Sequence, residues 1–364
     1  MSMLHIGIAG AGLLGRLVAW TLVRQLGSSC RIEVFDPADG PEPRFDGHGA
    51  AAFTAAGLLS PLAEQDVASA ATAALGWRSL DLWPRIVAAL PGTPYFAARG
   101  SLLLAHRSDA GAAQRLLARL PAPAVSAAAP QALTTDQLGQ LEPALQGIAQ
   151  AWLLPGEGQI DPIGTLRGLH EGTRGAHVRW HWRAPVAELR HAALRVESAG
   201  ASAWRGFDAV FDLRGLGARP PLPLRGVRGE TVWLHAPGHG LTRPVRLLHP
   251  RHRVYIAPRP GDLLVVGASE IESEDRSEVS LKSAVELMAA AHSVPPALQE
   301  ARILRLDRNL RPALPDNEPC VEVQPGLVRI NGLFRHGWLL APALVEDALA
   351  RWRALLPAVT EAVA

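Results

Sequence analysis

The sequence LHIGIAGAGLLG, residues 4–15, joins a short apolar run to a glycine-rich turn and the first residues of a periodic segment. Residues 4–9 are apolar and rich in branched side chains, which is typical of a buried strand. Apolar residues then recur at helical spacing over residues 13–26, and Gly27 follows as a helix C-cap would. Residues 31–35 (RIEVF) repeat the strand pattern and are followed by Asp36. This order of strand, glycine turn, helix and strand predicts a βαβ unit, and therefore a parallel sheet.

The glycine turn has the GxGxxG spacing of a dinucleotide-binding motif. Gly10 permits a tight turn, Gly12 lets a pyrophosphate approach the backbone, and Gly15 allows the helix to pack closely on the strand. The helix N-terminus offers N–H groups to the phosphates. Asp36 follows Gly15 by 21 residues and can accept hydrogen bonds from both ribose hydroxyls. The pattern predicts binding of FAD or NAD; the alternative is a glycine-rich turn in another kind of α/β protein.

The composition argues against several other classes of protein. The 364-residue chain has a formal net charge of +2, so nothing in its charge favours nucleic acid as a partner. Two cysteines, Cys30 and Cys320, and the absence of CxxC or HExxH spacing argue against a metal site or a disulfide framework. No apolar stretch reaches the ~20 residues that span a bilayer, and the N-terminus lacks the basic region of a signal peptide. The sequence therefore predicts a soluble cytoplasmic protein.

Arginine dominates the basic residues. Lys282 is the only lysine, so 35 of the 36 basic residues are arginine. The plainer interpretation of this bias is GC-rich codon usage, but arginine is also the side chain that binds carboxylates through two parallel hydrogen bonds. The positions of particular arginines therefore matter more than their number.

The rest of the chain mixes helix and strand patterns without an internal repeat. Residues 156–162 are predicted to form a turn, and helical patterns cover residues 63–90, 110–120, 163–172, 280–291 and 342–356. Strand patterns cover residues 100–105, 177–182, 186–190, 194–197, 209–213, 231–235, 253–258, 263–267 and 327–332. Both ends of the chain are thus α/β in type, with a strand-rich section between them.

Beyond the dinucleotide motif, the sequence resembles the D-amino-acid oxidase family of flavoproteins, and most closely its glycine oxidase branch, which serves thiazole synthesis in thiamine formation. The resemblance covers nearly the whole chain, and its last two segments are the most specific. The segments are, in order, AFTAAGLLSP (52–61), GQIDP (158–162), DAVFDLRGLGA (208–218), GVRGE (226–230), VYIAPRPGDLLVVGA (254–268), LRPALPDNEP (310–319) and NGLFRHGWLLAP (331–342).

The resemblance implies an α/β fold in which a Rossmann-like FAD-binding domain is interleaved with an α+β substrate domain built on a mixed or antiparallel sheet. It assigns residues 1–78, 150–220 and 309–364 to the FAD-binding domain, and residues 79–149 and 221–308 to the substrate domain. It also implies FAD rather than NAD as the cofactor, and an enzyme: an FAD-dependent amino-acid or amine oxidoreductase.

The resemblance further implies a set of cofactor-binding residues. Ala56-Gly57-Leu58 stands where many members have Gly-Gly-Met, Asp36 replaces a more common glutamate, and His336 stands where glycine oxidases often have a different polar residue. The N–H groups of residues 337–339 would favour negative charge on the flavin, together with a helix that begins near Pro342. The full set is Gly10, Gly12, Leu13, Leu14, Gly15, Asp36, Ala56, Gly57, Leu58, Val186, Gly215, Arg335, His336, Gly337, Trp338 and Leu339.

Three residues match the family's substrate site, each with a plainer alternative. Arg311 matches the arginine that binds the substrate carboxylate; the alternative is an arginine that holds a loop carboxylate such as Asp316. Tyr255 matches a strand tyrosine that hydrogen-bonds the same carboxylate, and would otherwise be an ordinary sheet residue. Arg335 resembles a second active-site arginine near the flavin, and would otherwise be a surface charge. Arg259 is interpreted as structural.

The implied reaction is oxidation of a small amino acid (glycine, sarcosine or a small D-amino acid) by hydride transfer from the α-carbon to flavin N5. The products are an imine, then a 2-oxo acid and ammonia, with O2 reduced to H2O2. The alternatives are an amino-acid dehydrogenase that passes electrons to a quinone or carrier, and a non-catalytic dinucleotide-binding module. The expected partners are the amino acid and O2, with no nucleic acid and no membrane; whether the chain forms a homo-oligomer stays open.

Overall fold

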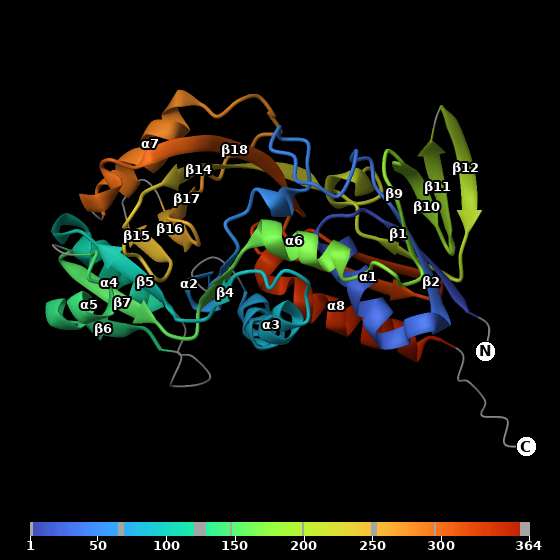
Figure 1. Ribbon diagram of the computed structural model, residues 1–364, viewed down its shortest axis with the longest axis horizontal. Helices are drawn as coiled ribbons and strands as arrows, with labels where there is room; N and C mark the ends of the chain where they lie inside the picture. The colour runs from blue at the N-terminus through green and yellow to red at the C-terminus, as the bar shows by residue number, and fades with distance from the viewer. Residues whose placement is uncertain are drawn as a thin grey trace, which may run out of the picture. The chain divides into compact units, whose positions relative to one another are not determined.

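The computed structural model describes residues 3–64, 69–119, 129–145, 148–198, 200–248, 253–294 and 296–356. The chain divides into two compact units, each built around its own sheet (Figure 1). Unit 2 comprises Pro43–Thr165 and Gly226–Arg311. Unit 1 comprises Met1–Glu42, Leu166–Arg225 and Pro312–Ala364.

Unit 1 is built on a six-stranded sheet. Its strands are β1 (Leu4–Ala9), β2 (Cys30–Phe35), β9 (Val178–His181), β13 (Ala209–Asp212), β19 (Cys320–Gln324) and β20 (Leu327–Asn331). Their order is β19-β20-β13-β1-β2-β9, and all neighbours are parallel except β19 and β20. Helix α1 (Leu13–Leu26) leads from β1 to β2 on one side, whereas β13 lies on the other. The strand order therefore reverses between β1 and β13, at the topological switch point of the sheet.

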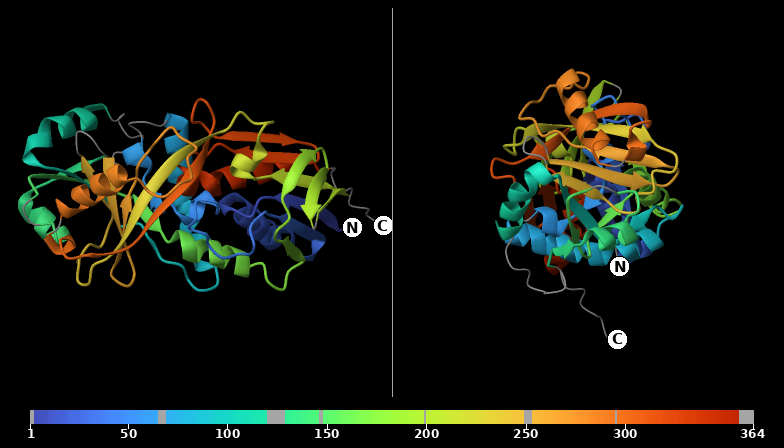
Figure 2. Two further views of the ribbon diagram at one scale, coloured as in Figure 1. Left: turned by 90° about the horizontal axis from the view of Figure 1, so that it is seen from above. Right: turned by 90° about the vertical axis from the view of Figure 1, so that its left-hand side faces the viewer.

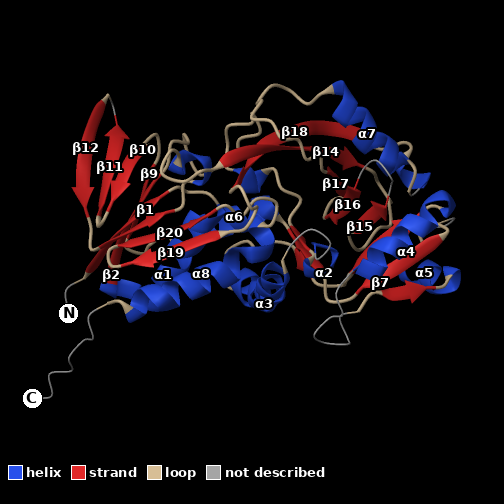
Figure 3. Ribbon diagram, turned by 180° about the vertical axis from the view of Figure 1, so that it is seen from behind, coloured by secondary structure: helices blue, strands red, loops and turns tan. Residues whose placement is uncertain are grey.

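Helices cover one face of the unit 1 sheet, and a small antiparallel sheet covers the other. Helices α1 and α8 (Gly337–Ala354) pack together on the first face (Figure 3). The second face carries a three-stranded sheet, seen in Figure 1 and from above in Figure 2, whose strands are β10 (Val186–Arg190), β11 (Ala193–Ser198) and β12 (Ala201–Gly206). Phe35, Leu194, Phe207 and Val210 are buried where this sheet packs on the larger one.

Unit 2 is built on a mixed eight-stranded sheet. In order across the sheet, its strands are β18 (Arg302–Ala313), β14 (Arg225–His235), β17 (Leu263–Gly267), β16 (Arg253–Arg259), β15 (Val245–Leu248), β5 (Ser101–Ala105), β7 (Gln150–Leu154) and β6 (Gln131–Leu133). Strand β15 is parallel to β5 and antiparallel to β16. A second, smaller sheet consists of β3 (Leu58–Leu59), β8 (Gly158–Ile160) and β4 (Phe96–Ala97).

The two faces of the large unit 2 sheet bury different residues, because alternate residues of each strand point to opposite faces. One face packs against α7 (Leu281–His292) in a core that includes Val232, Val266 and Leu287. The other face packs Trp233 and Val265 against Ala56 and its neighbours.

The remaining helices and 3-10 turns connect the strands of the two units. Among the described residues, the helices lack the combination of length and apolar character needed to cross a membrane. The other α-helices are α2 (Pro61–Glu64), α3 (Ala70–Ala88), α4 (Ala110–Arg119), α5 (Thr135–Leu141) and α6 (Pro162–Glu171). Single 3-10 turns occur at Gly27–Ser29, Ala51–Phe53, Arg107–Asp109, Gly215–Ala218 and Pro296–Leu298.

Of the elements that differ from the sequence-based predictions, three have a physical reason that their burial or strand pairing shows. Strand β12 was not predicted, since all its residues are exposed and only pairing with β11 defines it. Residues 158–160, predicted as part of a turn, form β8 because they pair with β3 and β4. Helix α8 begins at Gly337 and not near Pro342, because the apolar Trp338 and Leu339 are buried and extend it.

The compact units and the predicted domains are defined by different criteria. Residues 43–78 and 150–165, which the sequence assigns to the FAD-binding domain, belong to unit 2 by their contacts. A unit of packing need not coincide with the segments that bind a cofactor. The predicted domains therefore remain a prediction about cofactor and substrate binding.

Candidate cofactor and substrate sites

Several loops of unit 1 meet at the carboxyl edge of its parallel sheet. Strands β1, β2 and β13 end level with one another. The residues that follow them, Gly10, Asp36 and the turn from Gly215, therefore share this edge. Asn331, at the end of β20, reaches the same place, since its side-chain amide donates to the Gly215 carbonyl at 3.0 Å. In open α/β sheets this edge, at the switch point, is where ligands bind.

The glycine turn is too compact for side chains. Gly10 has a φ of +101°, and a Cβ there would lie 2.5 Å from the carbonyl oxygen of Leu213. A Cβ on Gly15 would overlap the carbonyl oxygen of Gly10. Helix α1 begins after Gly12, and its first turn carries no acidic side chain. The turn therefore presents bare backbone and the positive end of a helix, which suits a pyrophosphate.

Asp36 is fixed beside this turn by two backbone N–H groups. Its carboxylate accepts hydrogen bonds from the N–H of Ala11 at 2.6 Å and of Ala38 at 2.8 Å. Burial raises the pKa of Asp36, and the two hydrogen bonds and the nearby Arg16 guanidinium offset part of that effect. A carboxylate has about four acceptor positions, so two remain for ribose hydroxyls.

Arg16 is a residue of this site that the sequence-based prediction missed. Its buried guanidinium donates to the carbonyl oxygens of Ala11 at 2.8 Å, Leu166 at 2.9 Å and Pro41 at 2.7 Å. Burial lowers the pKa of Arg16 to about 10. Because Ala11 lies inside the glycine turn, Arg16 stabilises the conformation of that turn. The available signal was a charged residue among the apolar positions of the predicted helix.

The C-terminal motif of unit 1 leads into the N-terminus of α8. Arg335 lies on the preceding turn, and His336 is the buried N-cap residue, whose carbonyl accepts the first helical hydrogen bond. Gly337, Trp338 and Leu339 form the first helical turn. Their N–H groups point away from the helix and have no acceptor within it. Helix α8 thus begins five residues earlier than the predicted start near Pro342, and residues 337–339 are themselves its N-terminal residues.

The residues of unit 1 fit the dinucleotide part of FAD. The bare glycine turn and the start of α1, with Leu13 and Leu14, offer donors to phosphates, and Asp36 offers acceptors to a ribose. Val186 is buried at the start of β10, where its carbonyl accepts a hydrogen bond from Arg214 at 2.9 Å. Within the described ranges, no group of three or more His, Cys, Asp and Glu residues is placed to hold a metal ion.

The predicted flavin loop Ala56-Gly57-Leu58 lies in unit 2. Gly57 has a φ of +63°, and a Cβ there would overlap a backbone oxygen of β8, so this loop keeps the glycine that its conformation requires. Leu58 pairs with Gln159 of β8. Arg259 is buried and donates to the Ala56 carbonyl and to Gln159 Oε1, the latter at 2.6 Å. Burial lowers the pKa of Arg259 to about 10, and its contacts tie the loop to the sheet.

Arg311 is half-buried in unit 2, and two backbone carbonyls hold its guanidinium. Nη1 donates to the carbonyl of Arg228 at 3.2 Å, and Nη2 donates to that of Ser269 at 3.0 Å. The guanidinium lies over Gly229 of β14, where a Cβ would overlap its carbon and nitrogen atoms. Gly229 has the same strand phase as Trp233, so the charge lies on the sheet face opposite α7.

Tyr255 lies on the same sheet face as the guanidinium of Arg311. It pairs with Gly267, which also pairs with Thr231 of β14. A Cβ on Gly267 would lie 2.6 Å from Tyr255 Oη, so the phenol leans over this glycine. Because Gly267 pairs with Thr231, two residues after Gly229, the two glycines are diagonal neighbours on adjacent strands, and the Cα atoms of such neighbours lie about 7–8 Å apart. The side chains of Arg311 and Tyr255 therefore converge on one patch of the sheet.

The two glycines under these side chains were missed in the sequence. A glycine within a strand pattern often marks a position where another group approaches the backbone closely. Gly267 closes the predicted strand 263–267, which was the available signal. Gly229 lies in β14 but precedes the predicted strand 231–235, so the strand pattern gave no such signal there. Thr231, which lies between them in the sheet, is a further buried polar residue of this face.

The sheet order, the glycine turn and Asp36 define a dinucleotide-binding α/β protein with a second sheet-based unit. The chain matches the family model described as FAD dependent oxidoreductase (DAO) over residues 5–351, and it belongs to this family. It is an FAD-dependent oxidoreductase of the glycine oxidase and ThiO type. The predicted family, enzyme class and cofactor are confirmed.

Individual relatives agree with this assignment. A protein of Rhizobium etli named as the thiamine biosynthesis oxidoreductase ThiO is 35% identical to this chain over 350 residues, which cover 96% of each chain. The glycine oxidase of Bacillus licheniformis is 31% identical over 231 residues, 59% of this chain and 60% of that one. The structure of glycine oxidase from Bacillus cereus superposes with a TM-score of 0.80 at 19% identity, covering 96% of this chain and 95% of that one. This likeness confirms the predicted fold class.

We expect Asp36→Asn to weaken FAD binding about tenfold, because a charge-assisted hydrogen bond to the ribose becomes a neutral one. Only the ionised carboxylate makes the stronger bond, so the FAD affinity of the unmodified protein should fall as the pH drops through the raised pKa of Asp36. The affinity of Asp36→Asn should lack this fall. FAD titrations of the apoprotein across the acidic range measure both effects.

The matched control for Asp36→Asn is Asp208→Asn. Asp208 is exposed, lies at the amino end of β13 and accepts a hydrogen bond from the His5 N–H at 2.7 Å. The Asp208→Asn substitution should leave the FAD affinity and the pH dependence of that affinity unchanged. An Asp36→Asn protein that follows the pH profile of the unmodified protein would show that Asp36 does not bind the ribose.

Proposed function

We propose that this oxidoreductase acts on a small amino acid (glycine, sarcosine or a small D-amino acid) at its α-carbon. Bound FAD supplies the acceptor for the hydride that leaves the α-carbon. The imine product hydrolyses to a 2-oxo acid and ammonia or an amine, and O2 is the proposed final acceptor, reduced to H2O2. The relatives named glycine oxidase support this substrate class, and the relative named for thiamine biosynthesis supports a place in that pathway.

The observation that carries the proposal is the arrangement of Arg311 and Tyr255 on one sheet face. A guanidinium held at two nitrogens by backbone carbonyls has a fixed plane, and a fixed plane favours a bidentate pair with a carboxylate. The Tyr255 hydroxyl, over the diagonal glycine, can donate a further hydrogen bond to the same carboxylate. Together the two side chains fit the carboxylate that all the proposed substrates share.

The proposed work of these residues is binding and orientation. A carboxylate held at two points restricts the direction of the Cα–H bond, which removes much of the entropic cost of reaching the reactive geometry. No side-chain base is required when the amine arrives neutral. We propose that Arg335 and the N–H groups of residues 337–339 stabilise negative charge at the cofactor.

We propose that FAD and the substrate are bound by different parts of the chain, as the predicted domains imply. Residues 1–78, 150–220 and 309–364 would bind FAD, and residues 79–149 and 221–308 would form the substrate side. Two features support the inclusion of segment 43–78 in the FAD-binding part: the left-handed conformation of Gly57 and the buried Arg259 that holds its loop. Both are typical of backbone that is shaped to lie against a ligand.

Anaerobic titration of the purified yellow protein tests the proposal. Glycine, sarcosine or D-alanine should bleach the flavin absorbance, and air should restore it with formation of H2O2 in equal amount. Bleaching that is reversed by an artificial quinone but not by air would identify a dehydrogenase instead. If the bound flavin is bleached by none of these amino acids, the proposed substrate class is wrong.

A further inference from the structure

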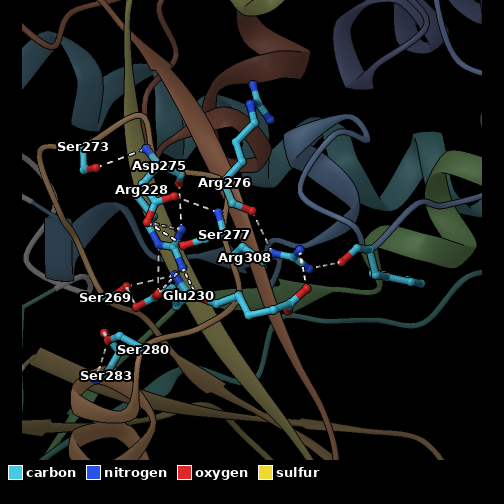
Figure 4. A network of polar contacts seen from close by, with 12 residues as sticks. Arg228, Glu230, Ser269, Ser273, Asp275, Arg276, Ser277, Ser280, Ser283 and Arg308 are labelled. Carbon is cyan, nitrogen blue, oxygen red and sulfur yellow. Dashed lines mark hydrogen bonds and ion pairs between the residues drawn. The ribbon is translucent and has the colours of Figure 1, made fainter.

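Figure 4 shows a network of polar side chains in unit 2, and two of its members, Arg228 and Ser269, have the backbone carbonyls that accept hydrogen bonds from Arg311. Glu230, at its centre, is fully buried and has the opposite strand phase to Gly229. Its Oε1 accepts a hydrogen bond from Arg228 Nε, and its Oε2 accepts one from Ser269 Oγ, both at 2.9 Å. Burial works to raise the pKa of Glu230, but hydrogen bonds from Ser283, Arg228 and Ser269 outweigh it and hold this pKa below its ordinary value.

Ser269 is bound to Glu230 by three hydrogen bonds. Besides the bond from its hydroxyl to Oε2, its Oγ accepts the Glu230 N–H at 3.0 Å, and its own N–H donates to the Glu230 carbonyl at 3.2 Å. These bonds fix the backbone of Ser269, whose carbonyl accepts Nη2 of Arg311. A single residue therefore connects the buried carboxylate to the guanidinium.

Arg228 supplies the second carbonyl that holds Arg311. Its own guanidinium is buried and donates to the carbonyls of Asp275 and Glu278, each at 2.7 Å, as well as to Glu230. With all three nitrogens bonded, Arg228 ties β14 to the loop before α7. The backbone carbonyl of Arg228, which accepts Nη1 of Arg311, thus lies on an anchored stretch of strand.

Gly229 lies between Arg228, whose carbonyl accepts Arg311, and Glu230, whose carboxylate holds Ser269. Its φ is outside the left-handed region, so the backbone would accept an alanine. The Cβ of that alanine would overlap the guanidinium of Arg311, which is the flexible end of a long side chain. Substitution of Gly229 would therefore move Arg311 rather than the fold.

We propose that Gly229, Glu230 and Ser269 are positioning residues for Arg311. They fix the height and plane of its guanidinium above β14, so that it meets the substrate carboxylate in bidentate geometry. This inference rests on the proposed function of Arg311 as the carboxylate-binding residue. None of the three needs to touch the substrate, so their loss should weaken carboxylate binding without loss of FAD.

The test compares Gly229→Ala, Ser269→Ala and Ser269→Thr in the FAD-loaded protein. The dissociation constant of acetate is measured from the flavin absorbance, and KM and kcat are measured with glycine. Gly229→Ala and Ser269→Ala should raise KM and the acetate dissociation constant together, about 10- to 100-fold, as expected for a guanidinium displaced by about 1 Å. The kcat, FAD content and melting temperature should change far less, and Ser269→Thr, which keeps the hydroxyl, should restore most of the affinity.

Two substitutions in unit 2 serve as matched controls. Gly139 lies in α5 with no atom within 4 Å of the position a Cβ would take. Ser293 follows α7, outside the network drawn in Figure 4, and its hydroxyl donates to the Ala290 carbonyl at 2.8 Å. Gly139→Ala and Ser293→Ala should bind acetate as the unmodified protein does. A fall in melting temperature that accounts for the loss of affinity, without recovery in Ser269→Thr, would overturn the proposal.

Arg311→Ala separates this inference from the proposed function. If Arg311→Ala loses acetate binding while Gly229→Ala and Ser269→Ala keep it, the positioning role is wrong and the proposed function stands. If Arg311→Ala itself binds acetate normally, the carboxylate is bound elsewhere and both proposals fall. Weaker binding in all three variants, with recovery in Ser269→Thr, is the expected result.

Discussion

Arg311→Ala should lower kcat/KM for glycine about 10²- to 10³-fold, the loss expected when one partner of a desolvated charge pair is removed. Most of this loss should appear in KM, because the carboxylate is bound in the ground state as well as in the transition state. Some should appear in kcat, since the α-carbon is no longer held in one orientation. Steady-state kinetics with glycine, together with the FAD content of the purified variant, measure these effects.

The control for Arg311→Ala is another arginine of β18. The Arg302 side chain is 74% exposed, and its ion pair with Glu300, at 3.7 Å, is of the solvent-exposed kind that contributes little. Arg302→Ala should therefore match the unmodified protein. Arg311→Lys should recover only part of the loss, because an ammonium lacks the planar pair of donors. Loss of flavin from Arg311→Ala, with KM unchanged, would assign the arginine a structural role instead.

The excess of arginine has several distinct structural uses. Arg16 and Arg259 are buried and bind backbone carbonyls of the two loops proposed to hold FAD, the glycine turn and the Ala56 loop. Arg228 is buried in an ion pair that supports Arg311. The planar guanidinium, with five donors, can satisfy several carbonyls at once, which an ammonium cannot do with the same geometry. A compositional bias thus includes residues that shape both candidate sites.

The start of the fold could be predicted because its signals are local. The residues of β1 and α1 coincide with the predicted ranges 4–9 and 13–26, since branched apolar residues, glycine and helical spacing each act within a few positions. Asp36 was also predicted, because its place follows from the length of the βαβ unit. These features need no knowledge of which distant segments pack together.

The support of Arg311 could not be predicted, because it depends on long-range contacts. Arg228 and Glu230 are charged, and the predicted strand accordingly began only at residue 231, whereas β14 begins at Arg225. Their burial is stabilised by Ser269 and by the loop carbonyls of residues 275 and 278, some 40 to 50 positions further along the chain. A sequence window cannot show that a charged residue will find such partners.

Gly15→Ala should abolish FAD binding and lower the free energy of unfolding by about 3 kcal/mol or more, the upper range for overpacking. The new Cβ would overlap the carbonyl oxygen of Gly10, and neither atom can rotate away, because the backbone fixes the positions of both. The helix must therefore move off the strand, which displaces the N-terminus of α1 from the phosphate position. Urea denaturation of the apoprotein measures the change in stability, and FAD titration measures the loss of binding.

Gly206→Ala is the matched control for Gly15→Ala in the same unit. Gly206 ends β12, has no positive φ, and has no atom within 4 Å of the position a Cβ would take. Alanine there should leave FAD binding unchanged and stability equal or slightly higher, because it reduces the entropy of the unfolded chain. The two substitutions add the same methyl group, and alanine favours a helix over glycine by about 1 kcal/mol, so a loss of stability seen only in Gly15→Ala reports the helix–strand contact. Equal stability and FAD affinity in the two variants would mean that α1 does not need its close approach to β1 to bind the cofactor.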